Sequence, residues 1–249
     1  NALPANGGTI YVKPGTYIFT SSWSVSKPNV NVVGDGRLST IISPSSDFSA
    51  ISVTGGIVFS MHNITMPVIL GSIAVVFVSA STFVSNNCEL DGVTGTAGAA
   101  IVADRTDFNR PLTDASVEDC VFTRCNFTAN SGVTGTFVNC LFDSCEWTCT
   151  ATAMTINGVS SNVHISNSSF VNTTTDTTVF SATNEVTNLR ISNSNFVGRN
   201  TGGTVSCVQA TSNLYDAVFT GCTFTGSHTA VTADSTIVSL SGGTKHCAF

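Results

Sequence analysis

The segment Ile165-Ser166-Asn167-Ser168-Ser169-Phe170 returns 26 residues later as Ile191-Ser192-Asn193-Ser194-Asn195-Phe196. Both copies place an apolar residue, an Asn, a small residue and a large apolar residue at the same offsets. A repeat of about 20–50 residues is one supersecondary unit that stacks on its neighbours. Related segments close at five further positions, which are Met66, Leu90, Phe122, Phe142 and Phe224. The sequence therefore predicts a solenoid.

The repeat unit is rich in β-branched and aromatic residues and lacks helical periodicity, which predicts one coil of β-strands per unit. Coils of paired strands stack at about 4.8 Å, so about eight of them, counting one at Gly34, make a rod roughly 40 Å long. At the corners, Asn tolerates a left-handed backbone and can bond along its own column. We expect an all-β, single-stranded, right-handed parallel β-helix of about eight coils, with residues 1–249 forming one domain.

Stacking of equivalent positions predicts columns of like residues. Asn139, Asn167 and Asn193 are expected to share one corner, and Trp147 is expected to be buried because it replaces Phe127 one coil later. The closing aromatic residues are expected to form one buried column, made of Phe122, Phe142, Phe170, Phe196 and Phe224.

The chain contains nine cysteines. Cys88, Cys120, Cys140 and Cys222 fall at the small-residue position of the repeat, where Ser168 also stands, and this favours packing of buried thiols. The spacing lacks the tight pairs and histidines of a structural zinc site, so we expect no metal and no cofactor. Disulfides between neighbouring coils stay open as an alternative, since stacked Cα atoms lie within bridging range.

The opening of the chain resembles a known family. Residues Leu3-Pro4-Ala5-Asn6-Gly7-Gly8-Thr9-Ile10-Tyr11-Val12-Lys13-Pro14-Gly15-Thr16-Tyr17, followed by Asn29-Val30-Asn31-Val32-Val33-Gly34-Asp35-Gly36, look like the opening of pectate-lyase-like right-handed β-helices. That family includes pectate lyases, polygalacturonases and many bacteriophage tailspike proteins, and in it an amphipathic helix usually covers this end of the core. Because solenoid ends need a polar cap, we expect a fragment of a longer chain or a partner at this end.

Composition restricts the partners. The net charge is −6 and only 10% of residues are charged, which opposes a nucleic-acid partner. The longest apolar run, Val68 to Val78, is interrupted by Gly71 and Ser72 and is too short to span a bilayer, so no membrane insertion is expected. Exposed solenoid ends offer unpaired strand edges, and we therefore expect a homotrimer or a larger assembly.

Catalytic patterns that the resemblance would imply are not found. The compact Asn-Thr-Asp, Gly-Asp-Asp and Gly-His motifs of polygalacturonases are absent from the sequence. A calcium site needs six or more oxygen ligands, so carboxylates would have to stack on neighbouring coils. The positions expected to stack there contain a single acid, and they read Glu89, Val121, Leu141, Ser169, Asn195 and Thr223.

Charge gathers instead between residues 104 and 124, within the 32-residue step from Leu90 to Phe122. A long step predicts an enlarged coil with a protruding loop, and such loops carry binding and catalysis. The loop could be a solvated surface with weak ion pairs, a ligand contact, or the paired carboxylates of a glycosidase. The candidate catalytic residues are Asp104, Asp107 and Glu118, and the candidate ligand-binding residues are Arg105, Arg110 and Asp114.

Two functions from different classes fit these observations. The first is a structural and receptor-binding rod of a phage tailspike, tail fibre or cell-surface appendage that contacts a polysaccharide or cell-surface glycan outside the cell or on a virion. The second is a polysaccharide-cleaving enzyme of the pectate-lyase-like group. Acids stacked on adjacent coils of one face would favour the enzyme, and the sequence pattern does not predict them. Arginines next to the candidate acids would keep those acids ionised, which favours the rod.

Overall fold

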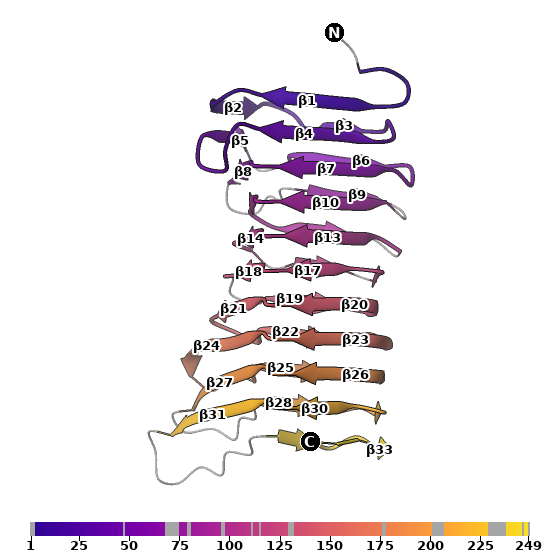
Figure 1. Cartoon of the computed structure of the whole chain (residues 1–249), viewed down its shortest axis with the longest axis vertical. Helices are drawn as coiled ribbons and strands as arrows, with labels where there is room; N and C mark the ends of the chain where they lie inside the picture. Colours follow the sequence, from indigo (N-terminus) through magenta and orange to yellow (C-terminus); the bar gives the residue numbers. More distant parts are fainter. Residues whose placement is uncertain are drawn as a thin grey trace.

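The computed structural model describes residues 3–46, 48–67, 75–78, 81–95, 98–110, 112–114, 116–128, 132–175, 178–200, 207–228, 238–245 and 247–248. Within these residues there are strands, turns and bends but no helix. The chain winds into coils that stack along one axis, with the N-terminal coil at one end of the rod and the C-terminal coil at the other (Figure 1). Every strand pairs in parallel with strands of the neighbouring coils, as in β1 with β4. The predicted parallel β-helix is confirmed.

Three sheets run along the rod. Sheet A contains β1 (Gly8–Val12), β4 (Val30–Gly34), β7 (Val58–His62), β10 (Thr82–Asn86), β13 (Ala100–Asp104), β16 (Val117–Glu118), β17 (Val121–Thr123), β20 (Phe137–Asp143), β23 (Ser160–Ser166), β26 (Val186–Ser192), β29 (Leu214–Tyr215), β30 (Val218–Thr220) and β33 (Thr244–Lys245). Sheet B contains β2 (Gly15–Phe19), β5 (Thr40–Pro44), β8 (Thr65–Met66), β11 (Glu89–Leu90), β14 (Asp107–Phe108), β18 (Asn126–Phe127), β21 (Glu146–Cys149), β24 (Ser169–Thr175), β27 (Asn195–Asn200) and β31 (Thr223–His228). Sheet C contains β3 (Trp23–Val25), β6 (Ile51–Thr54), β9 (Val75–Val78), β12 (Val93–Gly95), β15 (Leu112–Asp114), β19 (Val133–Gly135), β22 (Met154–Ile156), β25 (Phe180–Ala182), β28 (Val208–Ala210) and β32 (Val238–Leu240).

Sheets B and C contain ten strands each. The repeat motif marks about eight of these coils, because it does not mark the first coil or the coil of β13 to β15. In the latter, Arg105 stands where the motif has Asn. Leu90 pairs with Phe108 of the very next coil, at a distance of 18 residues along the chain. The enlarged coil expected between Leu90 and Phe122 is therefore wrong, and this stretch forms ordinary coils.

The coils in the second half of the rod have two corners, and both favour the same residue type. The first corner bends the sheet A strands, and its left-handed residues include Asp119, Asn139, Asn162 and Asn188. The second corner joins sheet A to sheet B five residues later. Its left-handed residues are Asn63, Asn87, Arg105, Arg124, Ser144, Asn167, Asn193 and Gly221.

The predicted hydrogen-bonded ladder of asparagines is present, but its residues divide between the two corners. Asn139 Nδ2 donates to Asp119 Oδ1 at 3.0 Å, and Asn162 Nδ2 donates to Asn139 Oδ1 at 2.8 Å. Asn193 Nδ2 donates to Asn167 Oδ1 at 3.5 Å in the other ladder. Asn139 thus lies at the first corner, and its predicted place beside Asn167 was wrong because the two corners share one sequence pattern.

The same ambiguity divides the predicted aromatic column into two. In sheet A, Phe122 stacks on Phe142 with ring centroids 4.8 Å apart, and Phe142 then aligns with Ile165. Trp147 is fully buried as predicted and stacks on Phe170 at 4.2 Å in sheet B. The complete sheet B column contains Phe108, Phe127, Trp147, Phe170, Phe196 and Phe224.

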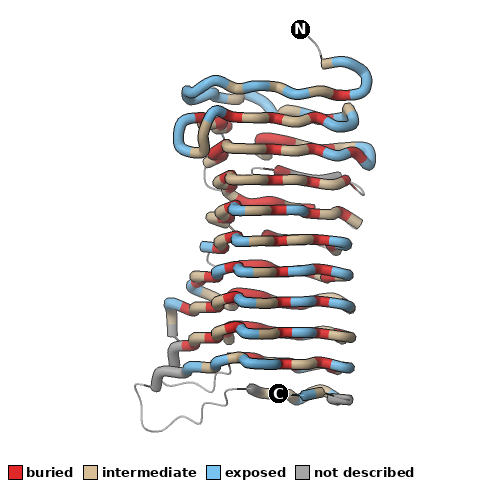
Figure 2. Tube along the Cα trace, in the orientation of Figure 1, coloured by how far each residue is buried: buried red, intermediate tan, exposed pale blue. Residues whose placement is uncertain are grey.

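The cysteines are present as thiols, most of them buried. Cys145 aligns with Ser168 at the second corner, where the Cys145 N–H meets Ser168 Oγ at 3.1 Å, whereas Cys140 aligns with Val163 near the first corner. The prediction that these cysteines share one position of the coil is therefore wrong, because the motif does not distinguish the two corners. Their burial supports the predicted packing role. Figure 2 shows buried residues recurring along each middle coil, while the first coil is largely exposed or intermediate.

Candidate functional site

The second corner carries a cluster of charge that we call the arginine corner, made of Asn86, Asp104, Arg105 and Arg124. Asp104 ends β13, and its Oδ1 accepts hydrogen bonds from Arg124 Nε at 3.0 Å and Arg124 Nη2 at 2.6 Å. Asp104 Oδ2 accepts from Arg105 Nε and from Asn86 Nδ2, both at 3.1 Å. An ionised carboxylate has about four acceptor positions. Asp104 is therefore saturated, and it holds both guanidinium groups in place.

The electrostatics of Asp104 follow from these contacts. Partial burial acts to raise the pKa of Asp104, but hydrogen bonds from Arg124 and Arg105 and their positive charges outweigh it and hold the pKa below its ordinary value. The carboxylate stays ionised at neutral pH, so Asp104 cannot serve as a general acid there. Its predicted catalytic role loses support, and its position supports a bracing role.

The two arginines stand in an uncommon backbone conformation. Arg105 has φ of 49° and Arg124 has φ of 53°, at positions where neighbouring coils have Asn or Ser. A bulky residue in the left-handed region is strained, and such strain gathers at functional sites. The side chains of Arg105 and Arg124 are 55% and 58% exposed. Each guanidinium has five N–H donors, and those not bound to Asp104 or Asn86 can meet a ligand.

A second cluster, the Arg37 cluster, lies on the sheet B side of the same corner and contains Arg37, Glu89, Asp107 and Asn126. Arg37 Nη2 donates to Asp107 Oδ2, and it lies 3.7 Å from Glu89 Oε2. Asn126 Nδ2 donates to Asp107 Oδ1 at 2.8 Å. Glu89 and Asp107 occupy adjacent coils in register. Acids therefore do stack on neighbouring coils of one face, which corrects the expectation from sequence.

The outward column of sheet B explains why the sequence pattern missed this stack. The sequence pattern predicts Val121 and Leu141 in it, but they belong to the outer face of sheet A. The column that contains Glu89 instead reads Thr65, Glu89, Asp107, Asn126, Glu146, Ser169, Asn195 and Thr223. Among the described residues, no group of three or more His, Cys, Asp or Glu side chains could hold a metal ion.

The loop of residues 35–39, between β4 and β5, lies beside this column (Figure 1). Thr65 Oγ1 in the next coil donates to the carbonyl oxygen of Arg37. Leu38 is 83% exposed at this loop. The loop and the second corner enclose a shallow hollow lined by Gly36, Arg37, Leu38, Ser39 and Asn87. The protruding element thus comes from the second coil and not from the stretch between Asp91 and Asp119.

The remaining candidates are not brought together with the arginine corner. Glu118 aligns with Val138 at the start of β20, before the first corner, and is exposed. Arg110 follows β14 and is half-buried. Asp114 ends β15 in sheet C, and its side chain lies outside the described residues. Asp107 and Glu118 therefore do not form a catalytic pair, while the structure adds Arg37, Glu89 and Arg124 to the site.

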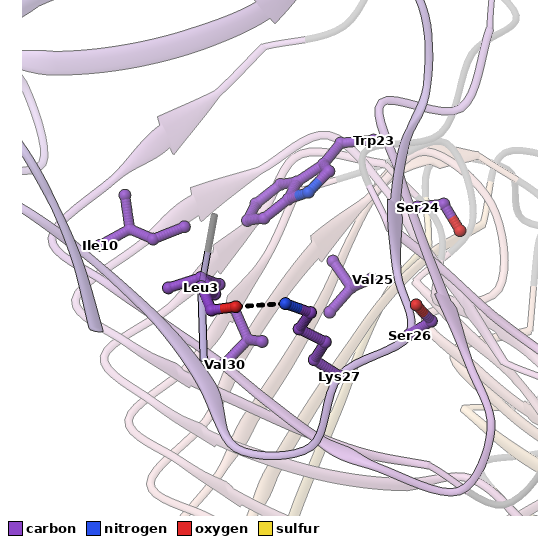
Figure 3. Close-up of a pocket in the computed structure, with 8 residues that line it drawn as sticks. All are labelled: Leu3, Ile10, Trp23, Ser24, Val25, Ser26, Lys27 and Val30. Carbon is purple, nitrogen blue, oxygen red and sulfur yellow. Dashed lines mark hydrogen bonds between the residues drawn. The ribbon is translucent and has the colours of Figure 1, made fainter. Parts of the chain in front are cut away.

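A different hollow opens at the N-terminal end of the solenoid. Figure 3 shows Ile10 and Trp23 turned toward this space, with the Lys27 ammonium donating to the carbonyl oxygen of Leu3. Ile10 and Trp23 are only partly buried, whereas Val32 and Ile51, which align with them in the next coil, are buried. This hollow is the inner face of the first coil, and its walls are mostly apolar.

Comparisons with known proteins place the fold. No family model matches the sequence, and no curated protein sequence matches it. The fold is that of solved parallel β-helix proteins. The A-module of mannuronan C-5 epimerase AlgE4 from Azotobacter vinelandii is 11% identical, with a TM-score of 0.56 over 97% of this chain and 89% of that chain. The catalytic unit of a GH87 α-1,3-glucanase from Streptomyces thermodiastaticus is 11% identical, with a TM-score of 0.46 over 97% and 64%. ORF18 of Geobacillus virus E2 is 12% identical, with a TM-score of 0.42 over 98% and 54%.

Proposed function

We propose that this chain is a glycan-binding β-helical rod of a phage tailspike, tail fibre or cell-surface appendage, acting outside the cell or on a virion surface as part of a homotrimer or larger assembly. The observation that carries this proposal is the arginine corner. Two exposed guanidiniums are fixed on adjacent coils by one saturated carboxylate. Such a group offers preorganised donors to hydroxyls and, in bidentate fashion, to carboxylated sugars.

The Arg37 cluster extends the proposed surface along the rod. The side chains of Glu89 and Asp107 are 29% and 23% exposed, and Asn109 Nδ2 donates to Glu89 Oε1 at 2.8 Å. Carboxylates and amides next to guanidiniums give alternating acceptors and donors, which suits the hydroxyl pattern of a polysaccharide. The resemblance in fold to an epimerase whose name specifies mannuronan agrees with a polymeric sugar as the ligand class.

The test is a binding measurement with the whole chain, using soluble mannuronan and a neutral glucan of similar length as probes. Arg124→Asn keeps a residue type that the corner accepts but removes the guanidinium. We expect it to weaken mannuronan binding by about tenfold or more, the worth of a charge-assisted hydrogen bond. Arg190→Asn is the matched control, because Arg190 is exposed in β26 away from the corner. Equal affinities for the wild type and Arg124→Asn would refute the proposed surface.

A second function, cleavage of a polysaccharide, is favoured by the stacking of Glu89 and Asp107 on adjacent coils. Catalysis by such a pair would require one carboxyl to be protonated and the other ionised. Both oxygens of Asp107 already accept hydrogen bonds, from Arg37 and Asn126, and Glu89 Oε1 accepts one from Asn109. We therefore expect no release of reducing ends from either probe. Release that disappears in Asp107→Asn would make the enzyme the better assignment.

A further inference from the structure

The outer face of sheet A carries an apolar stripe in the middle of the rod. Val84, Val102, Val121 and Leu141 follow one another in register on four successive coils. All four point away from the core, because the neighbouring positions Phe122 and Phe142 are fully buried. Val102 is 36% exposed and Leu141 is 37% exposed. A contiguous apolar surface with a polar rim marks an interaction site.

The same molecule provides the comparison that makes this stripe unusual. The equivalent outward column of sheet B is polar at every coil from Thr65 to Thr223. Sheets with one face in water normally alternate apolar inside and polar outside, and this column of sheet B follows that rule. Sheet A breaks it over four coils in a column. Neighbouring outward residues restore polarity at the rim, and they are Asn86, Asp104, Thr123, Asp143 and His164.

We infer that the outer face of sheet A is where this chain associates with a second copy of itself, side by side. The inference rests on the assembly proposed above and names the face through which its copies contact each other. A stacked coil repeats at about 4.8 Å, so another solenoid matches the row of side chains over the whole length of the face. Ten coils at about 4.8 Å each, with a face about 15 Å wide, offer about 700 Å² per copy, close to the roughly 800 Å² per partner of a stable interface. An apolar centre with a polar rim is the usual anatomy of such an interface.

The composition of the stripe separates a second copy from a sugar as its occupant. Sugar faces pack on aromatic rings, and the stripe is entirely aliphatic. The arginine corner lies at the edge of this face, because Asp104 ends β13 two residues after Val102. Arg105 and Arg124 begin the turn toward sheet B. The two surfaces meet at Asn86 and Asp104, but the aliphatic side chains and the two guanidiniums are different residues and can be disrupted separately.

Sedimentation of the whole chain tests the inference. The wild type should sediment as a multiple of 25.8 kDa. The double variant Val102→Glu/Leu141→Glu should raise the dissociation constant of the assembly by more than about tenfold, because like charges would face each other in the interface. The matched control is Val171→Glu/Val197→Glu, which makes the same change at two outward valines of sheet B, on a different face of the rod, and it should assemble as the wild type does.

A proximity measurement keeps the test independent of any loss of stability. Val102→Cys should be joined to its counterpart by a short bismaleimide, whereas Val171→Cys should not. A wild type that stays monomeric at its solubility limit overturns the inference. Assembly that survives the sheet A double variant also overturns it. Mannuronan binding by the double variant is measured in parallel, so that loss of assembly with binding retained separates this inference from the proposed ligand site.

Discussion

At the scale of single residues, the fold depends on amino acids that accept a left-handed backbone once or twice per coil. Asn fits because its amide bonds along the column, as between Asn188 Nδ2 and Asn162 Oδ1 at 2.7 Å. Arg105 and Arg124 take the same backbone conformation without that advantage. Their cost in conformational energy is offset by the shared contact with Asp104, and we propose that ligand contact is the reason for their presence.

Substitutions at Asn139 separate the backbone effect from the hydrogen bonds. Asn139→Ala should lower the free energy of unfolding by about 1–2 kcal/mol for the left-handed backbone, in addition to the loss of its bonds to Asp119 and Asn162. Asn139→Gly loses the same bonds but accepts positive φ freely. Chemical denaturation should therefore rank the glycine variant above the alanine variant. The reverse ranking would contradict the assignment of this corner.

The lowered pKa of Asp104 predicts how acid affects the arginine corner. A carboxylate whose pKa is lower in the folded state stabilises the fold at pH values above its unfolded pKa, and this contribution is lost as the pH falls through the folded pKa. The difference in melting temperature between wild type and Asp104→Asn should stay constant from pH 7 to about pH 5 and shrink below about pH 4. A difference that does not change over this range would show that Asp104 is not ionised in the folded state.

At the scale of the strand and coil, the sequence predicts the fold class well and the register less well. Two corners with the same preference for Asn lie five residues apart, as Asn162 and Asn167 show. In some coils only the first corner has an Asn or Asp, as at Asp119, while the second corner has another residue, as at Arg124. In those coils the motif matches the first corner instead of the second. Periodicity cannot resolve this, because a large inward apolar residue follows three residues after either corner, as Ile165 and Phe170 do. The contact of Arg37 with Asp107 spans 70 residues and leaves no local pattern.

The sheet A aromatic column provides a test at this scale. Phe142 is fully buried between Phe122 and Ile165, so Phe142→Ala should cost about 3–5 kcal/mol of unfolding free energy. Leu141→Ala is the control, because the preceding side chain points outward and is partly exposed. Its cost in the isolated chain should stay below about 1 kcal/mol. Equal costs measured by denaturation would mean that the register of β20 is shifted by one residue.

At the scale of the whole molecule, the rod presents chemically different faces along one axis. The second corner is charged, the outer face of sheet A is apolar in its middle, and the outward column of sheet B is polar. A solenoid can display such long, separate surfaces because every coil repeats the same backbone path. The described residues contain no helix long and apolar enough to cross a membrane.

Arg37 also determines how the rod opens in time. Coils of a solenoid contact only their neighbours, so opening from an end should proceed one coil after another. Arg37 belongs to the second coil, yet its guanidinium binds Asp107 in the fifth. The intervening coils cannot separate while that contact holds, and they should exchange their amide protons for deuterium as one cooperative unit. In Arg37→Ala, exchange should become graded from the first coil toward the fifth, while amides in β21, β24 and β27 keep their rates.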